Sequence, residues 1–172
     1  MLYHRQRHSR LHGRASAGNL ALAKKNGRSP HTLVINADNG PENNGSRTQW
    51  LKRLVEFSAA NSVIVQLACY PPYHSKYNPV ERVFGVLENY WNGDPLLTLD
   101  HALGMARNMT YKGVHPVSSL HPGGKKGVRL TKAEMRIIMP ALDRLEGVGK
   151  WFVRIIPEKA REVLAALQRM QS

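Results

Sequence analysis

Cysteine, acidic residues and long apolar runs are all scarce in this sequence of 172 residues. Its one cysteine, Cys69, cannot form a disulfide within the chain, which fits a reducing cytoplasm. No run of apolar residues approaches the roughly 18 to 20 that a membrane-spanning helix needs. No apolar signal-peptide core follows the basic N-terminal residues either. We therefore expect a cytoplasmic protein with no membrane partner.

The shortage of acidic residues leaves a large positive charge. The chain has 12 Asp and Glu against 25 Lys and Arg, which gives a formal net charge of +13. A polyanion is the natural partner of such a protein, and without a membrane segment this favours nucleic acid. The hydrophobic content of 42% is enough for the packed core of one ordinary domain.

The middle of the chain alternates between strand and helix patterns. Compact apolar runs over residues 31–37 and 63–70 predict two buried strands, each ended by turn or proline residues. Amphipathic patterns predict a helix over 47–60, capped by Ser46, and a helix over 79–91. This order of strand, helix, strand and helix predicts an α/β unit with parallel strands.

Two carboxylates lie where this unit could carry chemistry. Asp38 directly follows the first predicted strand, at the end of a strand where α/β sheets gather catalytic groups, although Asp-Asn-Gly also serves as an ordinary turn. Glu81 is the third residue of a helix that begins at Pro79 after Asn78, so it also fits a capping box. Together the two carboxylates could converge over one sheet edge and hold a divalent metal ion.

Two longer motifs contain these residues. The runs LVINADNGPENNGSRTQWLKRLVEF and YPPYHSKYNPVERVFGVLENYWNG resemble the DDE transposases of bacterial insertion sequences, and the resemblance extends over about residues 30–155. It implies a partial RNase H-like fold in which Asp38 is the second catalytic Asp and Glu81 the final Glu. Both would be ligands of Mg²⁺ or Mn²⁺. His74, Lys76 and Arg82 would lie beside the active site as DNA contacts, with ordinary solvation as the alternative.

The resemblance also implies a reaction and a domain organisation. The reaction is metal-dependent cleavage of DNA at the ends of a mobile element, followed by attack of the freed 3′-hydroxyl on target DNA. Homo-oligomerisation is expected from the resemblance alone. Helices are expected near 98–110, 131–145 and 158–170. The chain would then divide into a basic flexible arm (1–17), a partial RNase H-like catalytic core (18–95) and a mainly helical C-terminal extension (96–172).

The sequence departs from the family pattern in one respect. The first catalytic Asp of the family precedes the second on the first strand of the core, but residues 1–37 contain no Asp or Glu. Glu42 lies in the turn itself, and Glu88 lies about 10 Å along the helix axis from Glu81, so neither is a convincing substitute. We therefore expect a C-terminal fragment with an unpaired strand edge, marginal stability or self-association.

Three functions follow from these observations. The first is a transposase component whose missing strands come from elsewhere. The second is a catalytically inactive, basic DNA-binding remnant, in which the arm over 1–17 either contacts phosphates or is sequence read through from an upstream start. A host RNase H-like nuclease is the weakest, because the resemblance also runs through the loop residues and the C-terminal helices.

Overall fold

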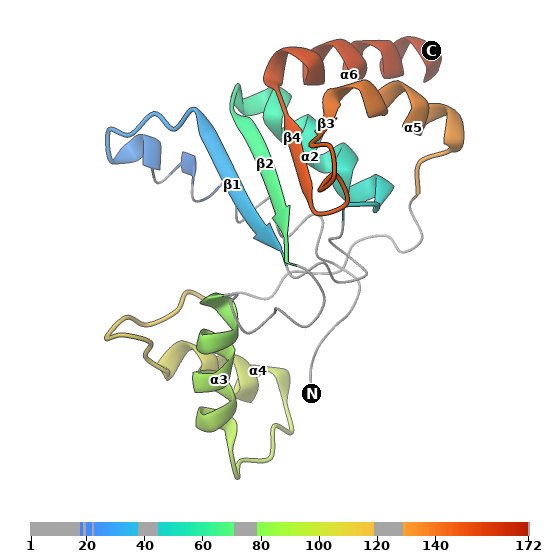
Figure 1. Cartoon of the computed structure of the whole chain (residues 1–172). Coiled ribbons are helices and arrows are strands. Elements are labelled where there is room, and N and C mark those ends of the chain that lie inside the picture. Colours follow the sequence, from blue (N-terminus) through green and yellow to red (C-terminus); the bar gives the residue numbers. More distant parts are fainter. Residues whose placement is uncertain are drawn as a thin grey trace. The chain divides into compact units, whose positions relative to one another are not determined.

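A computed structural model describes residues 18, 20, 21, 23–37, 45–70, 79–118 and 129–171 (Figure 1). The chain forms two compact units: residues 1–72 with 123–172, and residues 73–122. The arm predicted over residues 1–17 lies outside the described residues.

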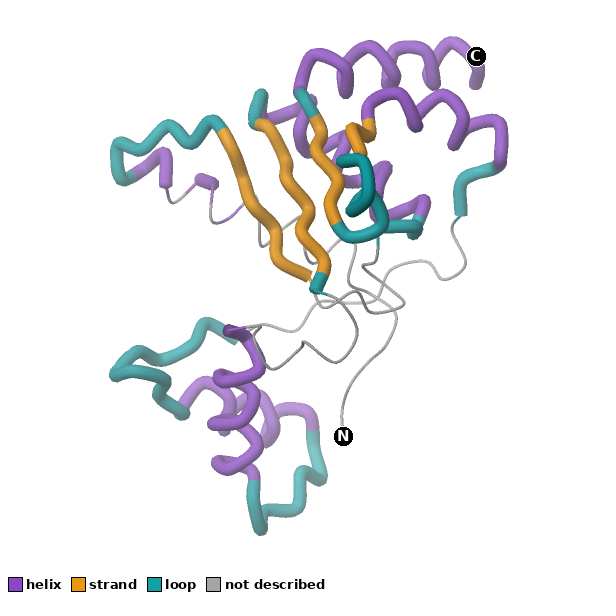
Figure 2. Tube along the Cα trace, in the orientation of Figure 1, coloured by secondary structure: helices purple, strands orange, loops and turns teal. Residues whose placement is uncertain are grey.

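The first unit contains a four-stranded sheet in the order β1-β2-β4-β3 (Figure 2). Its strands are β1 (Thr32–Ala37), β2 (Ile64–Cys69), β3 (Leu142–Arg144) and β4 (Phe152–Ile155). β1 and β2 are parallel, whereas β4 is antiparallel to both β2 and β3. The predicted α/β class with a parallel strand pair is confirmed, and the mixed sheet is compatible with a partial RNase H-like fold.

Helix α2 (Thr48–Asn61) connects the two parallel strands, which need a crossover of this kind. It begins one residue later than predicted, and its N-cap is Arg47 rather than Ser46, with no side-chain cap hydrogen bond. Ser62 ends the helix in a left-handed conformation with φ 53°. Strand β2 begins two residues after Ser62, so the connection from α2 to β2 is short.

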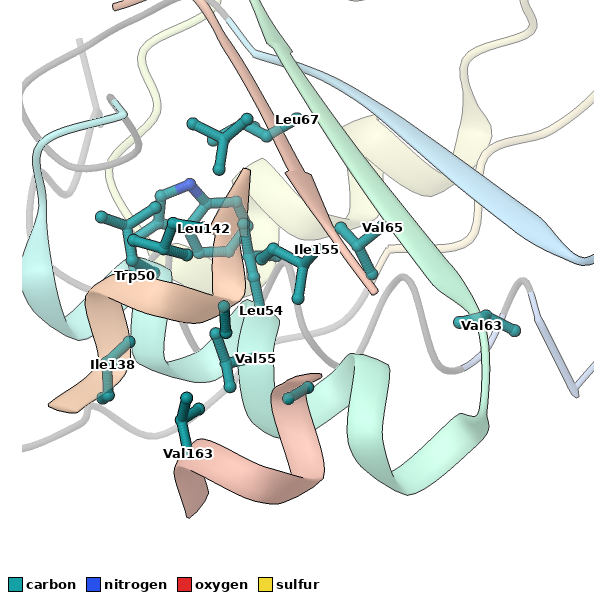
Figure 3. Close-up of a cluster of buried hydrophobic side chains, with 14 of the residues drawn as sticks. Trp50, Leu54, Val55, Val63, Val65, Leu67, Ile138, Leu142, Ile155 and Val163 are labelled. Atoms are coloured by element: carbon teal, nitrogen blue, oxygen red, sulfur yellow. The ribbon is translucent and has the colours of Figure 1, made fainter. Parts of the chain in front are cut away.

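One face of the sheet forms the core with α2 and with α6 (Pro157–Gln171) (Figure 3). Alternate residues of the central strands point into it, and Val65, Leu67 and Ile155 are fully buried. Trp50 of α2 is 1% exposed. At roughly 25 cal/mol per Å² of apolar surface, this burial is the main stabilising contribution to the first unit.

Strand β1 differs from its prediction as a buried strand. It lies at one end of the sheet order, where β2 is its one neighbour among the described strands. Leu33 and Ile35 are therefore only partly buried, and Val34 is 54% exposed. Ala37, the last residue of the strand, is buried.

The C-terminal region is mainly helical, as predicted, with α5 (Lys132–Ile138) and α6 against the first unit's core. The helix predicted over residues 131–145 nevertheless ends early. A 3₁₀ turn (Met139–Ala141) containing Pro140 follows Ile138, because proline has no N–H to continue the helical ladder. The chain then forms β3 and β4, two strands that were not predicted.

The second unit contains α3 (Pro79–Trp91) and α4 (Leu99–Asn108), which pack against each other. The bounds of α3 agree with the prediction, and Gly93 follows it with φ +84°. Thr98 caps α4 by accepting a 3.1 Å hydrogen bond from the N–H of His101. Within the described residues, no helix has both the length and the apolar character needed to cross a membrane.

Candidate active site

The carboxyl ends of β1 and β2 meet at one edge of the sheet. The parallel register runs from Thr32 opposite Ile64 to Ala37 opposite Cys69. The N–H of Tyr70 then donates a 2.8 Å hydrogen bond to the carbonyl of Ala37. Asp38 follows Ala37 directly in the chain but lies outside the described residues. This edge is where open α/β sheets place ligands and catalytic groups.

The hairpin of β3 and β4 brings a third segment to the same edge. Because β4 runs antiparallel to β2, its first residue, Phe152, lies opposite Ala68 near the end of β2. The N–H of Cys69 donates a 2.7 Å hydrogen bond to the carbonyl of Trp151. Strand β3 ends there too, so the turn over residues 145–151 lies at the carboxyl edge of the parallel strands (Figure 2).

Arg144, the last residue of β3, forms hydrogen bonds both to this turn and to Gly45, which follows Asp38 in the chain. Its Nη1 donates a 2.7 Å hydrogen bond to the carbonyl of Gly149, and its Nη2 donates a 2.6 Å hydrogen bond to the carbonyl of Gly45. Gly45 is the first described residue after residues 38–44. The second contact joins positions 99 residues apart, and no local sequence pattern predicts it.

The two glycines fit tightly around Arg144. A Cβ atom on Gly45 would lie 3.0 Å from the carbonyl oxygen of Lys150. A Cβ atom on Gly149 would lie 3.0 Å from Cβ of Arg144 and 3.1 Å from the carbonyl oxygen of Leu145. All three distances are shorter than ordinary van der Waals contact, so larger residues would displace the backbone at this edge.

Glu81 lies in the other unit, in the first turn of α3, and is exposed. No hydrogen bond or ion pair joins its carboxylate to another residue that the structure describes. Arg82 follows it and is also exposed. His74 and Lys76 lie outside the described residues, as does Asn78, the predicted helix cap. The convergence of Asp38 and Glu81 therefore stays a prediction, as does the capping role of Glu81.

The described part of the chain contains no group of three or more His, Cys, Asp or Glu side chains able to hold a metal ion. Asp38 lies outside that part, so the predicted pair of metal ligands is not tested by this observation. The exposed oxygens of Glu81 suit a hard cation such as Mg²⁺, which prefers oxygen ligands and keeps several waters.

A family model described as the Rhodopirellula transposase DDE domain matches residues 21–157, which is more than half of the chain. The chain belongs to this family. The resemblance to DDE-type transposases of insertion sequences is thus confirmed. The match spans the whole sheet, including the β3–β4 hairpin, and ends at the first residue of α6. No curated protein and no solved structure matches the chain.

Membership of this family leads to two general expectations, one about the binding partner and one about metal ions. A transposase family has DNA as its partner, and the DDE transposases generally use divalent metal ions. The high positive charge of the chain agrees with the first.

Proposed function

We propose that this chain is the part of a DDE transposase that supplies the second and third catalytic carboxylates, Asp38 and Glu81. The observation that carries the proposal is the position of Asp38, directly after the buried Ala37 at the shared carboxyl edge of β1 and β2. The family match across residues 21–157 includes both carboxylates.

Each carboxylate has a simple task. Asp38 and Glu81 would be ligands of Mg²⁺ or Mn²⁺, and their negative charge would hold the ion. A bound divalent ion supplies activation of the attacking oxygen and stabilisation of the leaving oxygen of a phosphodiester. Neither residue forms a covalent bond to DNA, because water and the 3′-hydroxyl of the DNA are the nucleophiles.

Cationic residues near Glu81 position the DNA. Arg82 is exposed on the first turn of α3 and is available for a phosphate contact. His74 and Lys76 precede the same helix, and we assign them to the same phosphate backbone. The net charge of +13 adds attraction that does not depend on DNA sequence.

The first carboxylate of the triad is not supplied by residues 1–37, which contain no Asp or Glu. Glu88 lies two helical turns beyond Glu81, about 10 Å along the axis, and does not replace it. We propose that residues 1–172 do not complete the triad and act as a C-terminal fragment of the catalytic core. The first carboxylate then comes from another segment or chain.

Binding of Mn²⁺ to the 172-residue chain tests this proposal directly. Isothermal titration calorimetry compares the wild type with Asp38→Asn and Glu81→Gln, and with Glu88→Gln as a matched control on the same helix. We expect each of the first two variants to weaken binding by about 10-fold or more, while the control binds as the wild type does. Equal affinities in all four proteins would refute the assignment of both carboxylates.

A second candidate function is DNA binding without cleavage. The absence of Asp and Glu from residues 1–37 favours it for this chain acting alone. Plasmid binding and the Mn²⁺ titration together separate the two functions. Plasmid binding with Mn²⁺ binding that depends on Asp38 supports the transposase part, whereas plasmid binding without such Mn²⁺ binding supports the non-catalytic remnant.

A further inference from the structure

Three cations lie shortly before strand β1. Lys24 and Lys25 are the last of a set of helical residues, and Arg28 follows them on the way into the strand (Figure 1). All three residues are exposed, and we call them the basic turn. Within the described part of the chain, no ion pair joins any of them to an acidic residue. Their charge is therefore available to a partner from outside the chain.

The backbone holds the basic turn in one shape. Gly27, with φ +72°, ends the helical residues. The N–H of Arg28 donates a 2.9 Å hydrogen bond to the carbonyl of Ala23, and the N–H of Gly27 donates a 3.0 Å bond to the carbonyl of Lys24. These two bonds form a Schellman cap. Leu20, which is 4% exposed, anchors the same helical residues in the core. Cations on such a support lose less conformational freedom on binding than cations on a loose chain.

The basic turn and the carboxyl edge lie at opposite ends of β1. The N–H of Ile64 donates a 2.9 Å hydrogen bond to the carbonyl of His31, which fixes the chain at the amino ends of β1 and β2. The six residues of β1 then span about 17 Å to Ala37. Phosphates that contact the basic turn therefore lie away from the edge at which β1 ends.

Charge complementarity indicates the chemistry of the partner. Residues 1–37 contain no Asp or Glu, so no acidic side chain of that stretch offsets the three cations. A polyanion fits such a surface. The family to which the chain belongs has DNA as its partner, which favours DNA among polyanions.

We infer that the basic turn is a second DNA-binding surface, which contacts phosphates of duplex DNA away from the carboxyl edge of the sheet. Contacts from lysine and arginine to phosphates hold and orient a duplex without reading its sequence. The inference goes beyond the proposed function, because it does not depend on metal binding by Asp38 or Glu81. It requires only the DNA partner that family membership indicates.

Two of the three cations also have a simpler role. The C-terminal end of a helix has a partial negative charge, so Lys24 and Lys25 stabilise it whether or not DNA is bound. If that were their whole role, removing them would lower stability but leave the salt dependence of DNA binding unchanged. Arg28 lies beyond the helical residues, so its removal leaves both lysines in place.

The test uses fluorescence anisotropy with duplex DNA at several salt concentrations and no divalent ion. The first variant combines Lys24→Ala, Lys25→Ala and Arg28→Ala. A matched control removes the same charge from three exposed cations on or beside α5, by combining Arg129→Ala, Lys132→Ala and Arg136→Ala. A conservative variant keeps the charge by combining Lys24→Arg, Lys25→Arg and Arg28→Lys. Urea denaturation measures the stability of each protein.

We expect the first variant to reduce the magnitude of the slope of log K against log salt by about 2 to 3, because each phosphate contact contributes about 0.9. The α5 control and the conservative variant should both keep the wild-type slope, since a phosphate contact requires a positive charge at this place. Arg28→Ala alone should reduce the magnitude by about 1. This single variant decides the question if the triple variant does not fold.

Three outcomes would overturn the inference. An unchanged slope in the folded alanine variant, with lower stability, would leave the lysines only their role at the helix end. An equal reduction in the α5 control would mean that net charge acts wherever it lies. Binding to phosphatidylserine vesicles that the alanine variant abolishes, with an unchanged DNA slope, would assign the surface to anionic lipid. Because no divalent ion is present, failure of the Mn²⁺ titration refutes the proposed function without affecting this test.

Discussion

Ala37 and Cys69 lie opposite each other as the last register pair of the two parallel strands, and both are buried. The two chain segments that carry the proposed catalytic residues begin directly after this pair. Backbone hydrogen bonds hold the pair in place, from Tyr70 to Ala37 and from Cys69 to Trp151. The geometry of this sheet edge thus depends mainly on the strand register. The register depends in turn on good packing of the core beneath the sheet.

Ser58 is expected to be a strong contributor to that core. It is 0% exposed, and its Oγ donates a 2.8 Å hydrogen bond to the carbonyl of Val63, just before β2. Ser58→Ala leaves this carbonyl without its partner, so the free energy of unfolding should fall by about 1 to 3 kcal/mol. Urea denaturation measures the change. Ser29→Ala, at an exposed serine, is the control and should change stability by less than about 0.5 kcal/mol.

Glu134 is expected to make stability depend on pH. The N–H of Thr131 donates a 2.7 Å hydrogen bond to its carboxylate in a capping box at the start of α5, and this bond is the main reason that the pKa of Glu134 is lowered. A lowered pKa in the folded state favours folding when the group is ionised. The contribution is therefore complete above the ordinary glutamate pKa and is lost as the pH falls through the lower folded value.

Glu134→Gln tests this dependence, because an uncharged amide can keep a capping bond but cannot titrate. The urea midpoint of the wild type should fall more between neutral and acidic pH than that of the variant. The difference should be small, because the hydrogen bond between Thr131 and Glu134 is exposed to solvent. Parallel pH profiles for the two proteins would contradict the prediction.

The sequence alone was enough to predict the elements that have strong local sequence signals. The helix predicted over 79–91 has the bounds of α3, because Pro79 at its start and Gly93 after its end influence the backbone in ways that do not depend on tertiary contacts. The motif around Asp38 was specific enough to indicate the family.

Features that depend on distant contacts were not predictable in this way. Strand β1 has an apolar sequence, but its burial depends on how many neighbours it has, and β2 is its one described partner. The β3–β4 hairpin has short strands, and its register follows from pairing with β2. The bond between Arg144 and Gly45 joins positions 99 residues apart, so no local pattern could indicate it.

Strand β1 is expected to promote self-association. Residues 32–37 contain no charge and no proline, two features that commonly prevent an edge strand from pairing with another strand, and Val34 is 54% exposed. Val34→Lys should shift the chain toward monomer in sedimentation velocity experiments at a fixed concentration. Met170→Lys adds the same charge on α6, where Met170 is 45% exposed, and should leave the association unchanged. An equal shift in both variants would mean that net charge, and not the edge, controls the association.

DNA binding is expected to weaken steeply with salt. The logarithm of the association constant should fall linearly with the logarithm of salt concentration, with a slope of about −0.9 per neutralised phosphate, because each contact releases a condensed counterion. Fluorescence anisotropy with duplex DNA at several salt concentrations gives this slope.

If Arg82 contacts one phosphate, Arg82→Ala should reduce the magnitude of the slope by about 1. Arg161→Ala removes an arginine that already bonds Glu158, and its slope should match the wild type. A slope near zero for the wild type would contradict phosphate contacts altogether. An unchanged slope in Arg82→Ala would instead remove only this residue from the DNA interface.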